Sequence, residues 1–330
     1  MFRSFSKIRA PEFPADLVWV NSDSLTMKAL RGKPILIDFW TYSCVNCLRT
    51  LPHVKQWYNR YEKLGLTVIG VHSPEFEFEK DDMNVRRAIN ELGIEYPVVL
   101  DSDFAIWKQF ANRVWPHVFL IDARGTIVFD HAGEGGAVEI ESEIQKTFAE
   151  IGVTTFPDIL PERVRGGDVC YRTTPETYLG YLRGTIGNAH DALPDSEEAF
   201  DDANNHIEGV PYLHGHWRQA GEYVEHTRSL SLATEYLSLK YSAFEINIVM
   251  GALDDRETTV DVVIDGKPIP ATMIGSDVVI DDGGKTHIHV ASHRLYSIIR
   301  ADHYHNATIK ICVRSAGLRM YAFTFGGCKS

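Results

Sequence analysis

Hydrophobic and polar positions follow two different patterns along the chain. In the first half, short continuous apolar runs typical of buried strands alternate with segments whose apolar residues recur every three or four positions, the spacing of a helix. The apolar runs that predict strands are 17–21, 34–40, 66–72, 96–100, 118–122 and 127–131. The segments with helical spacing are 44–64, 80–92, 104–111 and 139–151. Strands that alternate with helices and end in a hairpin and a helix predict an α/β layer with helices on both faces of the sheet.

In the second half the helical spacing disappears and short strands dominate. Apolar and alternating runs predict strands at 236–240, 244–250, 258–264, 286–290, 295–300, 308–313 and 320–325. Turn sequences such as Asp265-Gly266 separate these runs. About seven strands at this spacing predict an all-β sandwich or jelly roll.

The change of pattern predicts two domains. A length of 330 residues agrees with a prior of one domain per ~150 residues. Residues 154–184 contain prolines and the pair Gly166-Gly167. These residues interrupt both the helical and the strand-like spacing of hydrophobic residues, which is typical of a linker. We therefore expect an α/β domain at 1–153, a linker at 154–184 and a β domain at 185–330.

Composition and charge exclude several classes of protein. Hydrophobic residues make up 44% and charged residues 24% of the chain, which excludes a disordered, collagen-like or coiled-coil protein. The net charge is −12, and an acidic chain without a basic stripe is not expected to bind nucleic acid. No apolar stretch approaches the ~18–20 residues of a membrane helix. Since the N-terminal residues lack the apolar region of a signal peptide, we expect a cytoplasmic protein, or an extracytoplasmic one if this is a fragment of an exported chain.

One pair of cysteines stands where redox chemistry is expected. Cys44 and Cys47 form a C-x-x-C motif between the apolar run 34–40 and the start of a helix. A helix N-terminus offers unpaired N–H groups and the positive end of the helix dipole, which stabilise a thiolate. Cys44 is therefore the expected nucleophile, and Cys47, about one turn later, the thiol that resolves a mixed disulfide. Asp38, inside the apolar run, is expected to exchange a proton with Cys47 and to have a raised pKa.

Other interpretations of these residues stay open at this point. A C-x-x-C pair is often half of a zinc site, but none of the nearby histidines forms a compact second pair with another. Those histidines are His53, His72, His117 and His131. A less favoured alternative is that the cysteines are a structural staple, and Asp38 alone could also be a hydrogen-bonded structural acid. The pattern Thr41-x-x-Cys44 also occurs in peroxide reduction, which would require a nearby arginine and a rigid pocket.

A second motif, Trp115-Pro116, stands just before the apolar run 118–122. Only ~5–6% of X-Pro bonds are cis, so this spacing alone does not predict a cis bond. A cis bond would expose the Trp115 backbone, which could then pair with an extended thiol substrate by strand-like hydrogen bonds. Trp40 and Tyr42 are expected to form the apolar rim of the same site.

Together these motifs resemble a thioredoxin fold of the TlpA-like branch, and in particular the soluble C-terminal part of the DipZ family. The residues that carry the resemblance are Phe39-Trp-Thr-Tyr-Ser-Cys-Val-Asn-Cys47, Trp115-Pro116, His131-Ala-Gly-Glu-Gly135 and Thr174-Pro-Glu-Thr-Tyr-Leu-Gly180. The resemblance covers nearly the whole chain, because the second half is similar to the β-rich domain of that family. Two departures stand out. The membrane electron-transfer domain of the family is absent from this sequence, and Thr50 stands where some TlpA-like reductases carry a glutamate.

The resemblance implies a thiol-disulfide oxidoreductase that reduces or exchanges protein disulfides. It implies that Cys44 is the nucleophile, Cys47 the resolving thiol, Asp38 the buried acid and Pro116 a cis-proline. No cofactor is expected beyond the redox-active disulfide of Cys44 and Cys47. Its partners would be protein thiols or disulfides and an electron donor, such as a membrane DsbD-like protein or thioredoxin. The alternative is a non-enzymatic protein whose β domain binds a glycan or another protein.

The β domain contains ten of the 14 histidines. The pairs His287-x-His289 and His303-x-His305 each put two imidazoles on one face of a strand, whereas His214-x-His216 is expected in a loop. We expect these histidines to be structural or exposed rather than metal ligands. Several aromatic residues could stack on sugar rings, namely Tyr212, Trp217, Tyr223, Tyr296 and Tyr304. No disulfide is expected among Cys170, Cys312 and Cys328.

Overall fold

The computed structural model describes residues 8–161 and 170–328. The chain divides into two compact units, residues 1–164 and 165–330, and each has hydrophobic clusters of its own. In the described residues, no helix combines the length and the apolar character that crossing a membrane requires.

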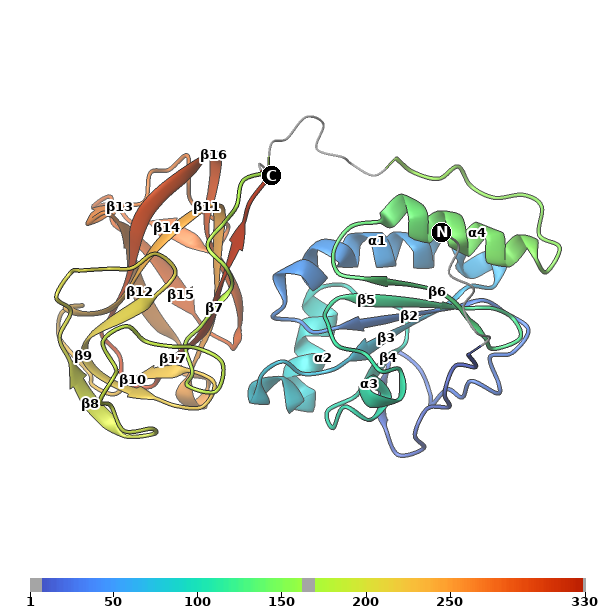
Figure 1. The fold of residues 1–330 in the computed structure, drawn as a ribbon, viewed down its shortest axis with the longest axis horizontal. Coiled ribbons are helices and arrows are strands. Elements are labelled where there is room, and N and C mark those ends of the chain that lie inside the picture. Colours follow the sequence, from blue (N-terminus) through green and yellow to red (C-terminus); the bar gives the residue numbers. More distant parts are fainter. Residues whose placement is uncertain (1–7, 162–169, 329–330) are drawn as a thin grey trace. The chain divides into compact units, whose positions relative to one another are not determined.

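The first unit is a six-stranded sheet with helices on both faces, in the strand order β1-β4-β3-β2-β5-β6 (Figure 1). Its strands are β1 (Val18–Val20), β2 (Ile35–Trp40), β3 (Thr67–His72), β4 (Val98–Leu100), β5 (His117–Ile121) and β6 (Ile127–Ala132). Its helices are α1 (Val45–Tyr61), α2 (Asp82–Glu91), α3 (Ala105–Gln109) and α4 (Ala137–Ala149), with 3-10 turns η1 (Glu62–Leu64) and η2 (Glu77–Lys80). Strand β2 is parallel to β3 and antiparallel to β5. The thioredoxin-like α/β domain expected from the sequence is confirmed.

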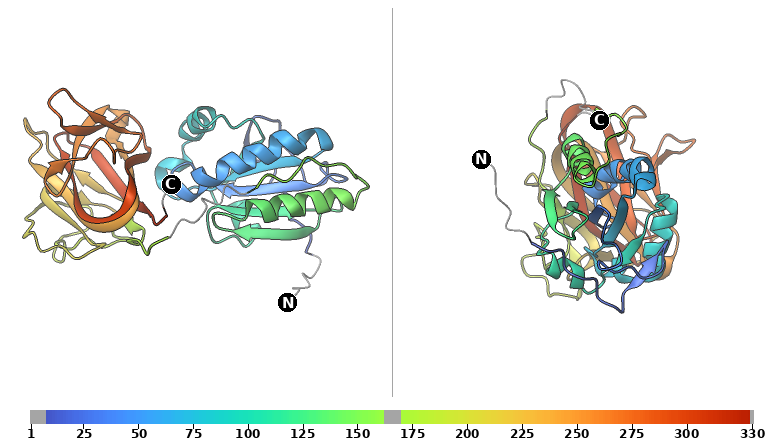
Figure 2. Two further views of the ribbon diagram at one scale, coloured as in Figure 1. Left: turned by 90° about the horizontal axis from the view of Figure 1, so that it is seen from above. Right: turned by 90° about the vertical axis from the view of Figure 1, so that its right-hand side faces the viewer.

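Strand β2 sends alternate side chains to two cores because successive residues of a strand point to opposite faces. Leu36 and Trp40 pack in the core that α1, α2 and α4 share, and α1 and α4 lie side by side over that face (Figures 1 and 2). Ile37 and Phe39 point to the other face, where they join residues of α3 and of the N-terminal segment. Because both faces are covered, every residue of β2 is buried, and the strand is a rigid support for the residues that follow it.

The second unit is all-β, as expected. Its main strand order is β14-β15-β12-β16-β11-β17-β10-β9-β8. The strands are β7 (Thr177–Tyr178), β8 (Glu197–Phe200), β9 (Pro211–Gln219), β10 (Val224–His226), β11 (Glu235–Ala252), β12 (Thr258–Ile264), β13 (Lys267–Pro268), β14 (Val278–Ile280), β15 (Thr286–Val290), β16 (Arg294–Val313) and β17 (Leu318–Gly326), with a 3-10 turn η3 (Leu253–Asp255). The finer description as a sandwich or jelly roll stays a prediction.

Two pairs of predicted strands are in fact continuous. The runs 236–240 and 244–250 are one strand, β11, and the runs 295–300 and 308–313 are one strand, β16. Polar residues separate the runs in the sequence, but they face each other across the two strands: the amide of Asn306 donates to the hydroxyl of Ser242 at 2.7 Å. Because these polar groups satisfy one another, the strands continue where the sequence pattern suggested a break.

The second unit also begins before residue 185. Strand β7 pairs with β17, the backbone N–H of Thr174 donates to the Ser242 carbonyl, and Leu179 belongs to the core of the unit. The prediction of no disulfide in this half is wrong, since Cys170 and Cys328 are bonded, with a Cα–Cα distance of 4.3 Å. The first and last parts of the unit meet at this bond, a proximity that residue spacing could not indicate. Cys312 is a free thiol.

Candidate active site

The C-x-x-C motif lies where strand β2 gives way to helix α1. Cys44 is the N-cap residue of α1, and its sulfur accepts the backbone N–H of Cys47 at 3.2 Å. This contact satisfies one of the N–H groups that a helix start leaves unpaired. Both thiols are free, Cys44 partly exposed and Cys47 only 3% exposed. Of the two residues, Cys44 is therefore the one that a reagent from solution can reach.

The buried thiol has a buried acid as its neighbour. Asp38 is 2% exposed, and burial, which disfavours the charged form, raises its pKa to about 7. Burial also raises the pKa of Cys47, with smaller contributions from Cys44 and from the negative charge of Asp38, while the backbone N–H of Thr41 lowers it. The raised pKa that the sequence predicted for Asp38 is present. Both Asp38 and Cys47 therefore tend to keep a proton, so a proton acceptor lies beside the thiol of Cys47 when that thiol must ionise.

The Trp115-Pro116 bond is cis, and it lies at the same end of the sheet as the cysteines. Strand β5 runs antiparallel to β2, with His117 opposite Phe39, so one further step puts Pro116 opposite Trp40. Trp115 is partly exposed. Its indole N–H donates to the carbonyl of Ser73 at 3.1 Å, and its ring packs on that of Trp107 at 4.4 Å between centroids.

The two residues expected at the apolar rim lie deeper than the sequence suggested. Trp40 is 2% and Tyr42 5% exposed, because the segment after β2 is covered by the residues that follow β3. Tyr42 stacks on His72 at 5.6 Å, and Trp40 meets the same imidazole edge-on at 5.3 Å. Trp40 and Tyr42 therefore belong to the core behind the site. Of the three aromatic residues expected at the site, Trp40, Tyr42 and Trp115, it is Trp115 that is partly exposed to solvent.

A buried polar cluster that the sequence analysis missed adjoins the cysteines. Glu79 of η2 is 0% exposed and accepts hydrogen bonds from Thr41 and Ser43, which immediately precede Cys44. The hydroxyl of Thr41 also lies 3.3 Å from His72 Nε2, and burial lowers the pKa of His72 to about 3, so this imidazole is neutral. The acidic residues between β3 and α2 look like a solvated segment in the sequence, and no signal there distinguishes Glu79 from Glu77. Thr50, where the family pattern has a glutamate, donates to the carbonyl of Asn46 at 2.9 Å.

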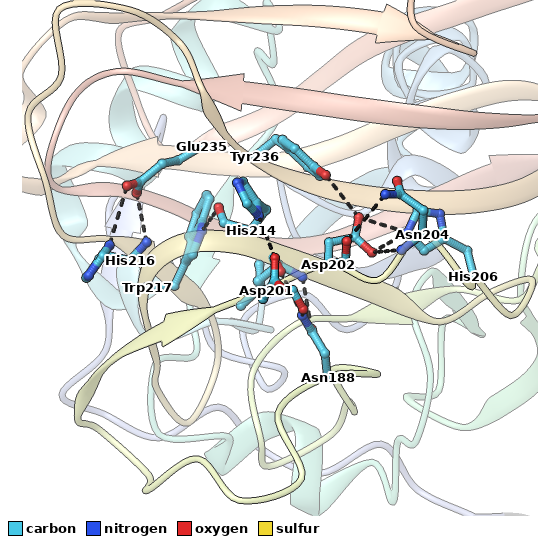
Figure 3. Close-up of polar contacts among 11 residues, drawn as sticks. Asn188, Asp201, Asp202, Asn204, His206, His214, His216, Trp217, Glu235 and Tyr236 are labelled. Carbon is cyan, nitrogen blue, oxygen red and sulfur yellow. Dashed lines mark hydrogen bonds and ion pairs between the residues drawn. The ribbon is translucent and has the colours of Figure 1, made fainter.

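Several histidines of the second unit have carboxylate or aromatic partners. His214 and His216 lie on strand β9 and not in a loop, so their predicted setting is wrong. Figure 3 shows these contacts: Glu235 binds His216, His214 lies 3.6 Å from Asp201, and Asp202 binds His206 at 2.8 Å. Within residues 8–161 and 170–328, no three His, Cys, Asp or Glu side chains converge as a metal site. The contact of Glu235 with His216 joins strands β11 and β9, whereas Asp201, Asp202 and His206 lie in the segment between β8 and β9.

Comparison with known proteins agrees with both units. Residues 8–130 match the model of the AhpC/TSA family, and residues 174–326 match that of the thioredoxin-like C-terminal domain. The protein DipZ of Mycobacterium bovis is 35% identical over 329 residues, which cover 96% of this chain and 43% of that protein. The thiol-disulfide oxidoreductase YkuV of Bacillus subtilis is 29% identical over 140 residues, covering 42% of this chain and 94% of YkuV.

Among solved structures, a thioredoxin-like protein in its oxidized form is 30% identical and has a TM-score of 0.41, covering 44% of this chain and 97% of that one. The chain thus spans less than half the length of the DipZ protein that it matches along nearly all of its own length. Along the chain, a segment similar to the AhpC/TSA family is followed by one similar to the thioredoxin-like C-terminal domain family.

Proposed function

We propose that the chain is a thiol-disulfide oxidoreductase in which Cys44 is the nucleophile and Cys47 the resolving thiol. The observation that carries the proposal is the unequal exposure of two cysteines at one helix start. Cys44 is partly exposed and accepts the Cys47 N–H, whereas Cys47 is buried beside the acid Asp38. The similarity to DipZ and to YkuV supports the same chemistry.

The proposed reaction moves two electrons from the dithiol to a substrate disulfide. The Cys44 thiolate attacks one sulfur of the substrate, the substrate S–S bond breaks, and one substrate thiolate leaves as a mixed disulfide forms. Cys47 then loses its proton to Asp38 and attacks the Cys44 sulfur. This step releases the second substrate thiolate and forms the Cys44–Cys47 disulfide. Asp38 suits this role because its pKa of about 7 lets it accept and return a proton near neutral pH.

The proposed substrates are disulfides in proteins, which would lie in extended form against Trp115 and the backbone at Pro116. Trp115 supplies a partly exposed ring there, and Trp40 and Tyr42 support this surface from within the core. A second dithiol protein, such as a membrane DsbD-like protein or thioredoxin, would reduce the pair again. The proposed chemistry needs no cofactor beyond the Cys44–Cys47 disulfide.

One further part of the proposal concerns the compartment, and it rests on the second unit. The Cys170–Cys328 bond favours an oxidising, extracytoplasmic compartment, because structural disulfides persist there. We do not extend the proposal to a glycan ligand. Trp217 and Tyr296 are 0% exposed, and Tyr304 stacks on Tyr171 at 4.8 Å, so these rings offer little free surface for a sugar.

Turnover of a protein disulfide, with dithiothreitol as the electron source, tests the proposed function. We expect Cys44→Ser and Cys47→Ser each to lower turnover at least 100-fold. The matched control is Cys312→Ser, which makes the same chemical change at a free thiol of the second unit and should leave turnover within twofold. Retained turnover in either of the first two variants would exclude the proposed exchange mechanism.

A further inference from the structure

Glu79 is a fully buried acidic residue whose two carboxyl oxygens accept hydrogen bonds from two different segments of the chain. Oε2 accepts the backbone N–H groups of Glu75 and Phe76, at 2.5 and 3.0 Å, and so caps its own short helix. Oε1 accepts the hydroxyl of Thr41 at 2.5 Å, the hydroxyl of Ser43 at 2.7 Å and the backbone N–H of Ser43 at 3.2 Å. The second set of bonds reaches a segment more than 35 positions away in the chain.

That segment leads directly into the C-x-x-C motif. Ser43 directly precedes Cys44, so the Glu79 carboxylate holds the residue from which the nucleophile extends. Thr41 is held by its hydroxyl, and its backbone N–H lowers the pKa of the Cys47 thiol. One carboxylate oxygen is thus bonded to Thr41 and to Ser43, the residue that directly precedes Cys44.

We infer that Glu79 is a positioning residue for the dithiol, which fixes the turn at residues 41–43 and thereby sets the redox equilibrium of Cys44 and Cys47. The inference rests on the proposed function, because a redox equilibrium matters only if the two cysteines exchange disulfides. The measurement that tests the inference does not depend on that function. A cap for η2 alone would need only the bonds of Oε2, whereas Oε1 is bonded entirely to the turn before the cysteines. A buried carboxylate is costly unless donors surround it, and five hydrogen bonds meet that need.

The groups around Glu79 support this assignment. His72, also in contact with Thr41, is neutral because burial lowers its pKa to about 3, so this imidazole supplies no positive charge to the carboxylate. Burial raises the pKa of Glu79 to about 7, the bonds from Thr41, Ser43 and Phe76 lower it, and the charge of Glu75 raises it. The hydrogen-bond donors, and not an ion pair, therefore hold this side chain in place.

The test is the equilibrium between the Cys44–Cys47 disulfide and dithiothreitol in the full chain. Two electrons and two protons pass from dithiothreitol to the protein disulfide, and the Cys44–Cys47 peptide is followed by mass spectrometry so that Cys170–Cys328 does not interfere. In Glu79→Gln, whichever way the amide points, its NH2 group faces backbone or hydroxyl donors. We expect the turn to shift, the Thr41 N–H to leave Cys47, and the equilibrium to move at least fivefold toward the disulfide, because the reduced sulfur loses a donor.

The matched control is Glu77→Gln on the same short helix. Glu77 has a side chain that is 73% exposed and pairs with Lys80 at 2.6 Å, so the equilibrium should stay within twofold of wild type. Thr41→Val and Ser43→Ala each remove one donor without a change of charge, and each should shift the equilibrium in the same direction by at least twofold. If Glu79→Gln does not fold, these two variants test the inference in its place.

Equilibria within twofold of wild type in a folded Glu79→Gln, or in both hydroxyl variants, would overturn the inference. So would an equal shift in Glu77→Gln. This measurement needs no protein substrate. A wild-type chain that does not turn over protein disulfides, while Glu79→Gln still shifts its equilibrium, would contradict the proposed function and leave the positioning role intact.

Discussion

At the scale of single residues, two cysteines three positions apart have opposite environments. Cys44 is partly exposed at a helix start, and Cys47 is 3% exposed. A strand, a C-x-x-C motif and a helix in that order were enough to predict different roles for the two cysteines, and to predict Asp38 as a buried acid of raised pKa; the burial of Cys47 comes from the structure. Glu79 could not be predicted, because Glu75, Glu77 and Glu79 alternate in one acidic segment and only the fold determines which of them is buried.

The raised pKa of Asp38 predicts how stability depends on pH. Its folded pKa of about 7 lies above the ordinary 3.8, so the folded chain keeps a proton that the unfolded chain loses from about pH 4 upward. The contribution of Asp38 to stability is therefore full below the unfolded pKa and is lost as pH rises through about 7. Asp38→Asn cannot ionise, so its unfolding free energy relative to wild type should rise by roughly 3 kcal/mol between pH 5 and pH 8.

Urea unfolding at the two pH values measures this difference. Asp103→Asn, on the exposed surface before α3, is the control and should follow wild type at both. A difference between Asp38→Asn and wild type that is the same at pH 5 and pH 8 would show that Asp38 does not carry a raised pKa in the folded chain.

At the scale of elements, the sequence pattern predicted the strands and helices of the first unit well, because each apolar run is short and bounded by turn residues. It did worse in the second unit, where the long strands β11 and β16 continue through polar residues such as Ser242 and Asn306. Cross-strand hydrogen bonds decide that outcome, and such partners are not visible in one strand alone.

Strand β3 should tolerate no added side chain at Gly70. A Cβ there would lie 2.9 Å from Trp40 Nε1, 3.1 Å from the Tyr96 ring and 3.3 Å from Val98. We expect Gly70→Ala to lower the unfolding free energy by about 1–3 kcal/mol through overpacking, measured by urea unfolding. Gly283→Ala, whose Cβ would meet only the Asp281 side chain, should cost less than half as much. Equal effects of the two substitutions would contradict the tight packing behind the site.

At the scale of the whole molecule, two domains with a change of class between them were predictable from hydrophobic periodicity alone. The start of the second unit was not, because the short strand β7 takes its place through pairing with β17. The Cys170–Cys328 bond was missed for a similar reason. The two cysteines are 158 positions apart in the sequence, and only the folded unit brings them together.

Removal of that bond should affect stability and not exchange. In a chain with Cys170→Ser and Cys328→Ser, we expect the second unit to lose roughly 2–4 kcal/mol of unfolding free energy, because a long loop is no longer closed in the unfolded chain. Calorimetry measures the loss, and protein-disulfide turnover should stay within twofold because the first unit has its own core. Unchanged stability, or a large loss of turnover, would contradict this account.

Covalent trapping tests the central claim most directly. The Cys47→Ser variant, mixed with a peptide that contains one disulfide, should accumulate a mixed disulfide at Cys44 that mass spectrometry identifies on the peptide containing residues 44–47. The Cys44→Ser variant should form none. An adduct on Cys47 in the Cys44→Ser variant, formed at the same rate as the Cys44 adduct, would contradict the assignment of Cys44 as the nucleophile.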